Sequence, residues 1–481
     1  MAASAFNPVD EAKNYSKTLE RARIYMTPKY QLRLRQQSLE NTEQAARALL
    51  RDPERNFVNL CATGFDGCAG DVRLYDWGPD GYGIVKPVLF TARNGATLSG
   101  HVWATRAGPA HRPGIVITNG SVQANEQMYW YAAQALAKAG YVVMTWDPQG
   151  QGQSDVLGQG PDRLEGVPSQ TDGRPFFDGT EDAIDFFLSG AGHPYEPRPS
   201  CVSGTSHAPK QDRRVVAGLD AAYNPLAGML DRSRLGLAGH SYGAAGVSYI
   251  GQWDPRVDAV VAWDNLSGAD PNGGSGSFPP GERACPADPS QRTAAPLTKP
   301  ALGISADYFL PPTPNLTQPN PEAKAAQSIA YSDVGVDSGE LIIRGGSHLD
   351  FSWIPNPAFG ASLRGADMID WYTTAWFDKY VKGDRSADRR LLSDRWFDDA
   401  REAAVDPDGD GTMFSRYYRS RLDVGLDGGG RFDCEDLRPD PMRPAPPSTY
   451  PSGTCPGLVP RAQDGWPGDY DYVAIDTAPD G

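Results

Sequence analysis

One glycine-flanked serine is the strongest chemical signal in the sequence. Ser241 lies at the centre of Gly-His-Ser-Tyr-Gly at 239–243, which fits the G-x-S-x-G pattern of a nucleophile elbow. An apolar run at 235–238 precedes it, and a helix-like run at 244–250 follows it. Such a turn presents the serine Oγ at the carboxyl edge of a sheet and directs the N-terminus of a helix toward developing negative charge. The pattern therefore predicts that Ser241 is a nucleophile.

A serine hydroxyl needs a base, and one of the six histidines stands out. His348 follows the apolar run Glu340–Ile343 after the turn Gly345-Gly346, where a core strand gives way to a loop. The base in turn needs a carboxylate to orient it. Asp307 and Asp264 each follow a predicted strand, so the sequence offers two candidates for that carboxylate.

From 84 to 382 the chain resembles the α/β-hydrolase superfamily. The segment Gly-Gly-Ser-His-Leu-Asp-Phe at 345–351 is similar to the branch that contains secreted polyester hydrolases, platelet-activating-factor acetylhydrolases and dienelactone hydrolases. The resemblance implies that His348 is the base and that Asp307 is the triad acid. It leaves Asp264 as the alternative acid, because a minority of relatives use the earlier strand.

The same resemblance implies an oxyanion hole made of two backbone N–H groups. One belongs to Tyr242, the residue after the nucleophile. The second is expected from Ser121, because Asn119-Gly120-Ser121 stands where relatives often have His-Gly-x; Val122 is the alternative, one residue later. Trp353 and Trp263 are candidates for the wall of an apolar substrate pocket, although core packing explains either of them equally well.

The elements that must position these residues alternate between strands and helices, which is typical of an α/β fold. We expect a mostly parallel eight-stranded α/β-hydrolase sheet flanked by helices. The predicted strands are Ile84–Phe90, Thr97–Trp103, Gly114–Thr118, Tyr141–Trp146, Arg234–Ala238, Val257–Trp263, Pro300–Ser305 and Glu340–Ile343. The predicted helices of this region are Glu126–Ala139, Thr180–Leu188, Arg213–Leu230 and Gly365–Val381.

Composition divides the chain into three parts. Residues 1–83 are expected to form a helical arm, from about 9 to 53, followed by a loop. Residues 84–382 form the predicted catalytic domain, with Gly/Pro/Ser-rich insertions at 189–212 and 264–299 that we expect to cover the site as a cap. Residues 383–481 form a C-terminal extension with enough aromatic residues to pack on the core.

Charge and cysteine content limit the classes of function. The net charge of −15 argues against nucleic-acid binding, and no apolar run is long enough for a transmembrane helix. The six cysteines lie in loop-like segments, which suggests the disulfides 61–68, 201–285 and 434–455 and a secreted protein; a cytoplasmic enzyme with free thiols is the alternative. No signal peptide is evident in the first residues.

Asp406, Asp408 and Asp410 alternate like the start of a calcium loop, which leaves structural calcium as a weak prediction and a solvated turn as the favoured one.

These residues together predict a serine hydrolase that cleaves carboxylic esters through an acyl-enzyme, with no cofactor. Its expected partner is a small-molecule or polymeric ester. A serine peptidase or amidase on the same machinery is the first alternative, and a non-catalytic protein that kept the fold is the second. The sequence contains no propeller-like repeats, which argues against a propeller-gated peptidase.

Overall fold

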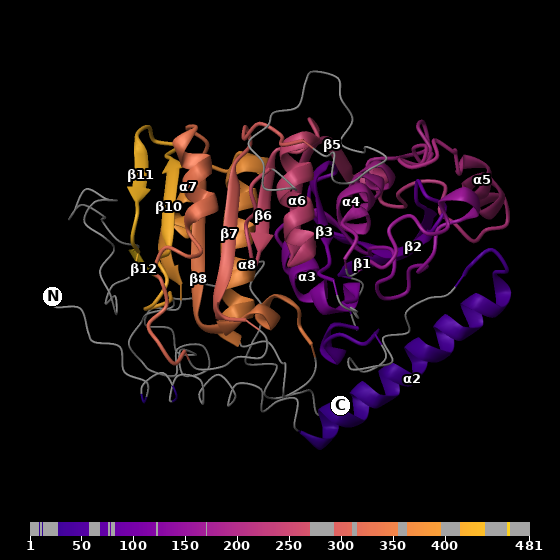
Figure 1. Ribbon diagram of the computed structural model, residues 1–481, viewed down its shortest axis with the longest axis horizontal. Helices are drawn as coiled ribbons and strands as arrows, with labels where there is room; N and C mark the ends of the chain where they lie inside the picture. The colour runs from indigo at the N-terminus through magenta and orange to yellow at the C-terminus, as the bar shows by residue number, and fades with distance from the viewer. Residues whose placement is uncertain are drawn as a thin grey trace.

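The computed structural model describes a central sheet, its helices and parts of both terminal segments (Figure 1). The residues that it describes are 9, 12, 27–56, 68–75, 77, 82–121, 124–169, 171–269, 293–309, 315–354, 363–395, 414–437 and 459–461.

A ten-stranded, mostly parallel sheet forms the centre of the molecule, with the strand order β1-β2-β4-β3-β5-β6-β7-β8-β10-β11. The strands from β3 to β8 run parallel to their neighbours, whereas β1, β2, β10 and β11 pair antiparallel. The strand bounds are β1 (Gly83–Thr91), β2 (Thr97–Thr105), β3 (Arg112–Thr118), β4 (Val142–Asp147), β5 (Leu230–His240), β6 (Ala259–Trp263), β7 (Ala301–Tyr308), β8 (Ser338–Ser347), β10 (Arg421–Gly425) and β11 (Arg431–Cys434). A separate parallel pair joins β9 (Ser393–Arg395) to β12 (Val459–Arg461).

Helices cover both faces of this sheet (Figure 1). The helix bounds are α2 (Pro28–Arg51), α3 (Trp130–Lys138), α4 (Arg174–Phe187), α5 (Ala208–Val216), α6 (Tyr242–Trp253), α7 (Ala326–Asp333), α8 (Leu363–Phe377) and α9 (Asp388–Leu391). Short 3-10 turns include η4 (Glu126–Tyr129) and η8 (His348–Phe351), and a π-helical turn, η9 (Asp378–Lys382), ends α8. Helices α3 and α8 share one hydrophobic core, while α4 and α6 share the other.

The apolar runs of the central strands explain this three-layer arrangement. In β3, Ile115 and Ile117 belong to the core under α3 and α8, whereas Val116 belongs to the core under α4 and α6. Successive side chains of a strand point to opposite faces, so a strand buried on both faces must be apolar throughout. Burial of both faces is the main stabilising contribution to such a fold.

The predicted strands all occur, but the sheet is wider than expected. Strands β10 and β11 come from the C-terminal extension and extend the sheet beyond β8. The sequence did not predict these two strands, because charged residues alternate with apolar ones in them and no continuous apolar run marks them. The predicted helix Arg213–Leu230 is wrong: α5 ends at Val216, Gly218 adopts a positive φ of 70°, and Pro225 cannot continue a helix.

The N-terminal arm contains one long helix, α2, that begins at Pro28 after the N-cap Thr27. Tyr30 and Leu34 pack into the core that α3 also uses. Just past its end, Asp52 forms a buried ion pair with Arg214 at 2.6 Å. The arm is therefore attached to the rest of the described structure at both ends of this helix.

Several sequence predictions fall wholly or partly outside the described residues. Cys68, Cys201 and Cys434 are described and none of them is a free thiol, whereas their predicted partners Cys61, Cys285 and Cys455 are not described. The Asp406, Asp408 and Asp410 loop is also outside them. None of the described helices combines the length and apolar character that a membrane crossing requires.

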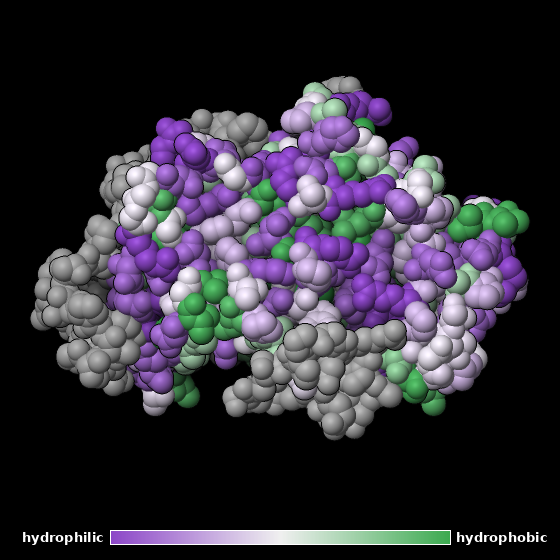
Figure 2. Space-filling view, turned by 90° about the horizontal axis from the view of Figure 1, so that it is seen from above, coloured by the Kyte–Doolittle hydropathy of each residue, from purple (hydrophilic) through white to green (hydrophobic). Residues whose placement is uncertain are grey.

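The surface of the molecule seen in Figure 2 is mainly hydrophilic. Hydrophobic residues gather there in several separated patches between polar ones.

Candidate active site

Ser241 occupies a strained turn between a central strand and a helix. Strand β5 ends at His240 and α6 begins at Tyr242, so that Ser241 alone makes the junction, with φ 56° and ψ −119°. A non-glycine residue in such a conformation costs about 1–3 kcal/mol and persists only where its surroundings hold it. Its N–H donates to the carbonyl of Trp263 at 2.9 Å.

The flanking glycines are required by close backbone contacts. A Cβ at Gly239 would lie 2.5 Å from the carbonyl oxygen of Gly243, and a Cβ at Gly243 would lie 2.3 Å from that of Asn119. Neither space can hold a side chain without backbone movement. The glycines of the sequence motif therefore permit the tight turn that Ser241 needs.

His348 begins the short turn η8 directly after β8. A reciprocal capping box stabilises the turn, because the Ser347 N–H donates to Asp350 Oδ2 and Ser347 Oγ accepts from the Asp350 N–H. Ser347 Oγ also accepts from the Leu349 N–H. The turn holds the imidazole in a mostly buried position, with 9% of the side chain exposed. Its Nδ1 lies 2.6 Å from Asp264 Oδ2.

Asp264 is therefore the carboxylate that contacts the candidate base. Its side chain is also only 9% exposed, so the two groups meet where water screens them little. A carboxylate on Nδ1 favours the tautomer with hydrogen on Nδ1 and leaves Nε2 free to accept a proton. This is the proton arrangement that a general base beside a serine requires.

The structure does not place Asp307 against His348, as the family resemblance led us to expect. Asp307 instead accepts the backbone N–H of Gly345 at 2.7 Å, and burial raises the pKa of its carboxyl. The reason is geometric: β7 continues through an irregularity to Tyr308, which leaves Asp307 inside the strand, whereas β6 ends at Trp263. Asp264 is thus the first residue of a loop and can turn toward the base.

Two further groups shape the electrostatics around Asp264. The ammonium of Lys324 lies 3.9 Å from Asp264 Oδ1, the carboxylate oxygen other than the one nearest His348, and donates to the carbonyl of Ala306. Glu340 lies in the core nearby, where burial raises the pKa of its carboxyl to about 8 while Ser305 donates to it. Burial therefore favours the neutral form of Glu340.

His240, next to the candidate nucleophile, links two loops of the site. Its Nε2 lies 2.9 Å from the backbone carbonyl of His348 and its Nδ1 lies 2.8 Å from the Tyr129 hydroxyl. Burial, together with the neighbouring His348, holds the pKa of His240 well below its usual value. A neutral ring with one N–H must donate from Nε2 to the carbonyl and accept from Tyr129, which itself accepts from the Gly120 N–H at 3.0 Å. His240 therefore joins the loop around Gly120 to the turn that carries His348 through hydrogen bonds.

The loop expected to supply the second oxyanion donor lies against the candidate nucleophile. A Cβ at Gly120 would be 3.2 Å from the Ser241 Cβ. Because the Gly120 N–H is already used by Tyr129, the next donor along the loop is that of Ser121; Val122, its alternative, is outside the described residues. Tyr242 is the first residue of α6, so its N–H lies at the positive end of that helix.

A buried carboxyl, that of Asp147, holds this loop through hydrogen bonds. Asp147 accepts the side-chain amide of Asn119 at 3.0 Å and the Glu126 N–H at 2.8 Å through one oxygen, and the Gln153 N–H through the other. Burial and the neighbouring Glu126 raise the pKa of Asp147 to about 8. Asp147 therefore has a structural role in holding this loop.

The two tryptophans proposed for a substrate pocket lie in the core instead. Trp263 and Trp353 are each less than 2% exposed, and the Trp263 indole donates to Thr373. Phe309 is an accessible aromatic residue beside the site: it is 68% exposed, and its ring centroid lies 4.9 Å from that of His348. Sequence reasoning missed Phe309, although its position just past β7, at the same edge as Asp264, was an available signal.

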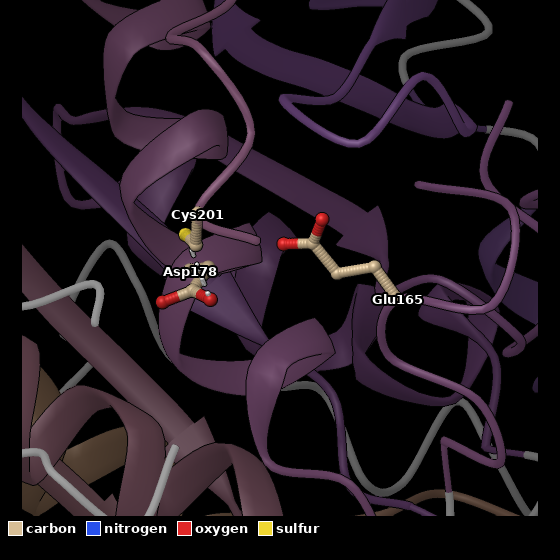
Figure 3. A group of neighbouring side chains, drawn as sticks. All are labelled: Glu165, Asp178 and Cys201. Atoms are coloured by element: carbon tan, nitrogen blue, oxygen red, sulfur yellow. Dashed lines mark hydrogen bonds between the residues drawn. The ribbon is translucent and has the colours of Figure 1, made fainter. Parts of the chain in front are cut away.

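One group of possible metal ligands lies away from these residues, among the part of the chain that is described (Figure 3). It consists of Glu165, Asp178 and Cys201. Arg174 lies 3.2 Å from Asp178 and 3.5 Å from Glu165, and Cys201 is not a free thiol. The arginine already compensates the carboxylates, so this group does not fit a metal centre.

Comparison of the sequence with models of protein families gives no match, and a search of curated proteins gives none either. The interpretation of the site depends on the geometry of its own residues.

Proposed function

We propose that this chain is an α/β-hydrolase-type serine hydrolase that cleaves carboxylic esters. The observation that supports it most is the combination of a serine in a strained strand-to-helix turn with a buried histidine–aspartate pair, His348 and Asp264, beside the neighbouring His240 ring at a centroid distance of 4.5 Å. Strands β1 to β8 form one continuous part of the sheet, with Ser241 at the carboxyl end of a central parallel strand, which is where open α/β sheets bind ligands.

In the proposed mechanism, His348 removes the proton from Ser241 as its Oγ attacks the ester carbonyl carbon. The carbonyl oxygen becomes an oxyanion, which the Ser121 and Tyr242 N–H groups stabilise, and each such donor contributes about 3 kcal/mol in known enzymes. Asp264 stabilises the imidazolium that forms. His348 then protonates the leaving alcohol, and water activated by the same histidine hydrolyses the acyl-enzyme.

Two further observations concern the kind of substrate and the compartment of the protein. The exposed ring of Phe309 next to His348 favours a substrate with an apolar acyl or aryl group near the scissile bond. The absence of free thiols among the described cysteines supports secretion into an oxidising compartment.

The decisive experiment compares the chain with its Ser241→Ala variant on p-nitrophenyl esters of graded acyl length and on peptide p-nitroanilides. We expect ester turnover that the substitution lowers by at least about 1,000-fold. Labelling of Ser241 by a fluorophosphonate, followed by mass spectrometry of the peptide, identifies the nucleophile independently. Unchanged turnover in Ser241→Ala would refute the proposal, whereas activity confined to the anilides would replace the esterase with a peptidase or amidase.

A further inference from the structure

A cavity lies between helix α2 and the β1–β2 edge of the sheet. It has a volume of about 560 Å³, and Ser241, His348 and Asp264 are not among its lining residues. Cavities of this size hold small organic ligands. Its walls come from α2, the segment around Tyr75, strands β1 and β2, and the turn η4, so the N-terminal arm is needed to close it.

One wall of the cavity is aromatic. Tyr75 and Trp130 lie with ring centroids 4.7 Å apart, and Trp103 contacts both Trp130 at 5.0 Å and Trp77 at 6.4 Å. Tyr75 and Trp77 are partly exposed, whereas Trp103 and Trp130 are almost entirely buried. Such a cluster presents a flat apolar surface with hydrogen-bonding groups at its edges.

The rest of the lining combines aliphatic residues, four of them from β1, with neutral amides contributed by Gln37, Asn41, Gln44, Gln127 and Gln153. Two polar atoms beside the aromatic wall are buried and have no hydrogen-bond partner among the described residues: the Gln127 amide oxygen and the Trp130 indole N–H. These residues are only 5% and 6% exposed. Unpaired buried polar groups are destabilising, and one acceptor beside one donor matches a hydroxyl, which can donate and accept.

The charged groups of the cavity are already paired within the protein. His101 Nδ1 lies 2.5 Å from Glu126 Oε1, and Arg55 Nε lies 2.6 Å from Asp155 Oδ1. No unpaired charge among these groups calls for an ionic ligand. His101 is partly exposed, at 22% of its side chain, and its second ring nitrogen adds a polar edge to the cavity.

We infer that this cavity is a binding site for a neutral polyhydroxylated ring, a sugar or the sugar unit of a glycan. The apolar C–H face of such a ring fits against Tyr75 and Trp77, and its hydroxyls fit the amides and the unpaired Gln127 and Trp130 atoms. A purely hydrocarbon ligand would leave the Gln127 and Trp130 atoms unpaired, and an ion would have to separate the existing pairs. The inference does not depend on the esterase proposal, because Ser241 and its partners are not part of the cavity.

The test is titration of the full chain with glucose, cellobiose and xylobiose, followed by intrinsic tryptophan fluorescence and by calorimetry. We expect saturable binding of at least one of these probes at about 10 mM or below. Gln127→Met should weaken it by about ten-fold or more, because the substitution removes the amide and keeps the side-chain length. Ala48→Trp should abolish it, because Ala48 is an exposed residue of α2 at the cavity wall, where a large side chain can fill the space.

Gln36→Met is the matched control, since Gln36 is exposed on the same helix and does not line the cavity. It should bind the probe like the unaltered chain, and the melting temperatures of all three variants show whether they fold. Absence of saturable binding for every probe would overturn the inference. Binding that persists unchanged in folded Gln127→Met and Ala48→Trp would place the sugar elsewhere and overturn it equally. A result in either direction leaves the Ser241 test unaffected, because binding is measured without turnover.

Discussion

Exchange of Asp264 for asparagine is the sharpest test of the site geometry. The carboxylate lies 2.6 Å from His348 Nδ1, and both side chains are 9% exposed. Asparagine has nearly the same shape but no charge. Its amide can also present N–H to the ring, which would place the imidazole hydrogen on Nε2 and remove the base from the serine.

The size of the effect follows from charge and tautomer together. Two unit charges about 4 Å apart interact by about 4 kcal/mol at an effective dielectric constant of about 20, so an uncompensated imidazolium costs about 1,000-fold in rate. Loss of the productive tautomer adds to this, and the corresponding change in a well-studied serine protease lowers kcat by about 10,000-fold. We therefore expect kcat/KM of Asp264→Asn to fall by about 1,000- to 10,000-fold.

The matched control is Asp307→Asn. An asparagine oxygen can still accept the Gly345 N–H, so we expect kcat/KM to change by less than about ten-fold. The assay is the initial rate on p-nitrophenyl butyrate, normalised to folded protein by circular dichroism. A large loss in Asp307→Asn beside a small one in Asp264→Asn would refute the reasoning and restore the acid that the family resemblance favours.

Three further predictions concern groups around the site. Tyr129→Phe should lower the unfolding free energy by about 1–3 kcal/mol, because it leaves the Gly120 N–H and His240 Nδ1 unpaired in the core; chemical denaturation measures this, and Tyr131→Phe, which loses one bond to Phe351, is the control. Gly120→Ala should lower kcat by about ten-fold with the fold retained, since its Cβ would lie 3.2 Å from Ser241 Cβ and displace the oxyanion loop; an unchanged kcat would contradict that placement. Glu340 has a pKa of about 8 in the folded chain against an ordinary value of 4.5, so the native state binds more protons and its stability should fall as pH rises from about 4 to 8. Melting curves of Glu340→Gln should show a smaller fall over that range, and an identical fall would exclude Glu340 as a source.

The parts of the site that the sequence revealed are those set by local geometry. The position of Ser241 was predictable because such a strand-to-helix turn needs glycines on both sides of one residue, and that of His348 because it directly follows the end of a strand. Local sequence could not decide which aspartate is the candidate acid. Asp264 and Asp307 follow neighbouring parallel strands at the same sheet edge, and the irregularity in β7 that separates their positions depends on pairing with β8.

The same division applies to the fold. Strands β3 to β8 were predictable because burial on both faces imposes continuous apolar runs. Strands β10 and β11 were not, since Arg421 and Asp423 are charged residues in an edge region and gain their partners only in the folded sheet, where Arg421 pairs with Glu435. Edge strands owe their formation to such long-range contacts more than to local pattern.

The hydrogen-bond chain through Tyr129 and His240 connects groups far apart in the sequence. His240 lies 111 residues from Tyr129 and 108 residues from His348, so no local pattern could reveal it. The chain has a single direction, because the carbonyl of His348 can only accept and the N–H of Gly120 can only donate. Burial keeps His240 neutral and so prevents it from reversing that direction. The loop with the proposed oxyanion donor and the loop with the proposed base are therefore fixed relative to Ser241 before any substrate arrives, which is the preorganisation that electrostatic stabilisation of an oxyanion requires.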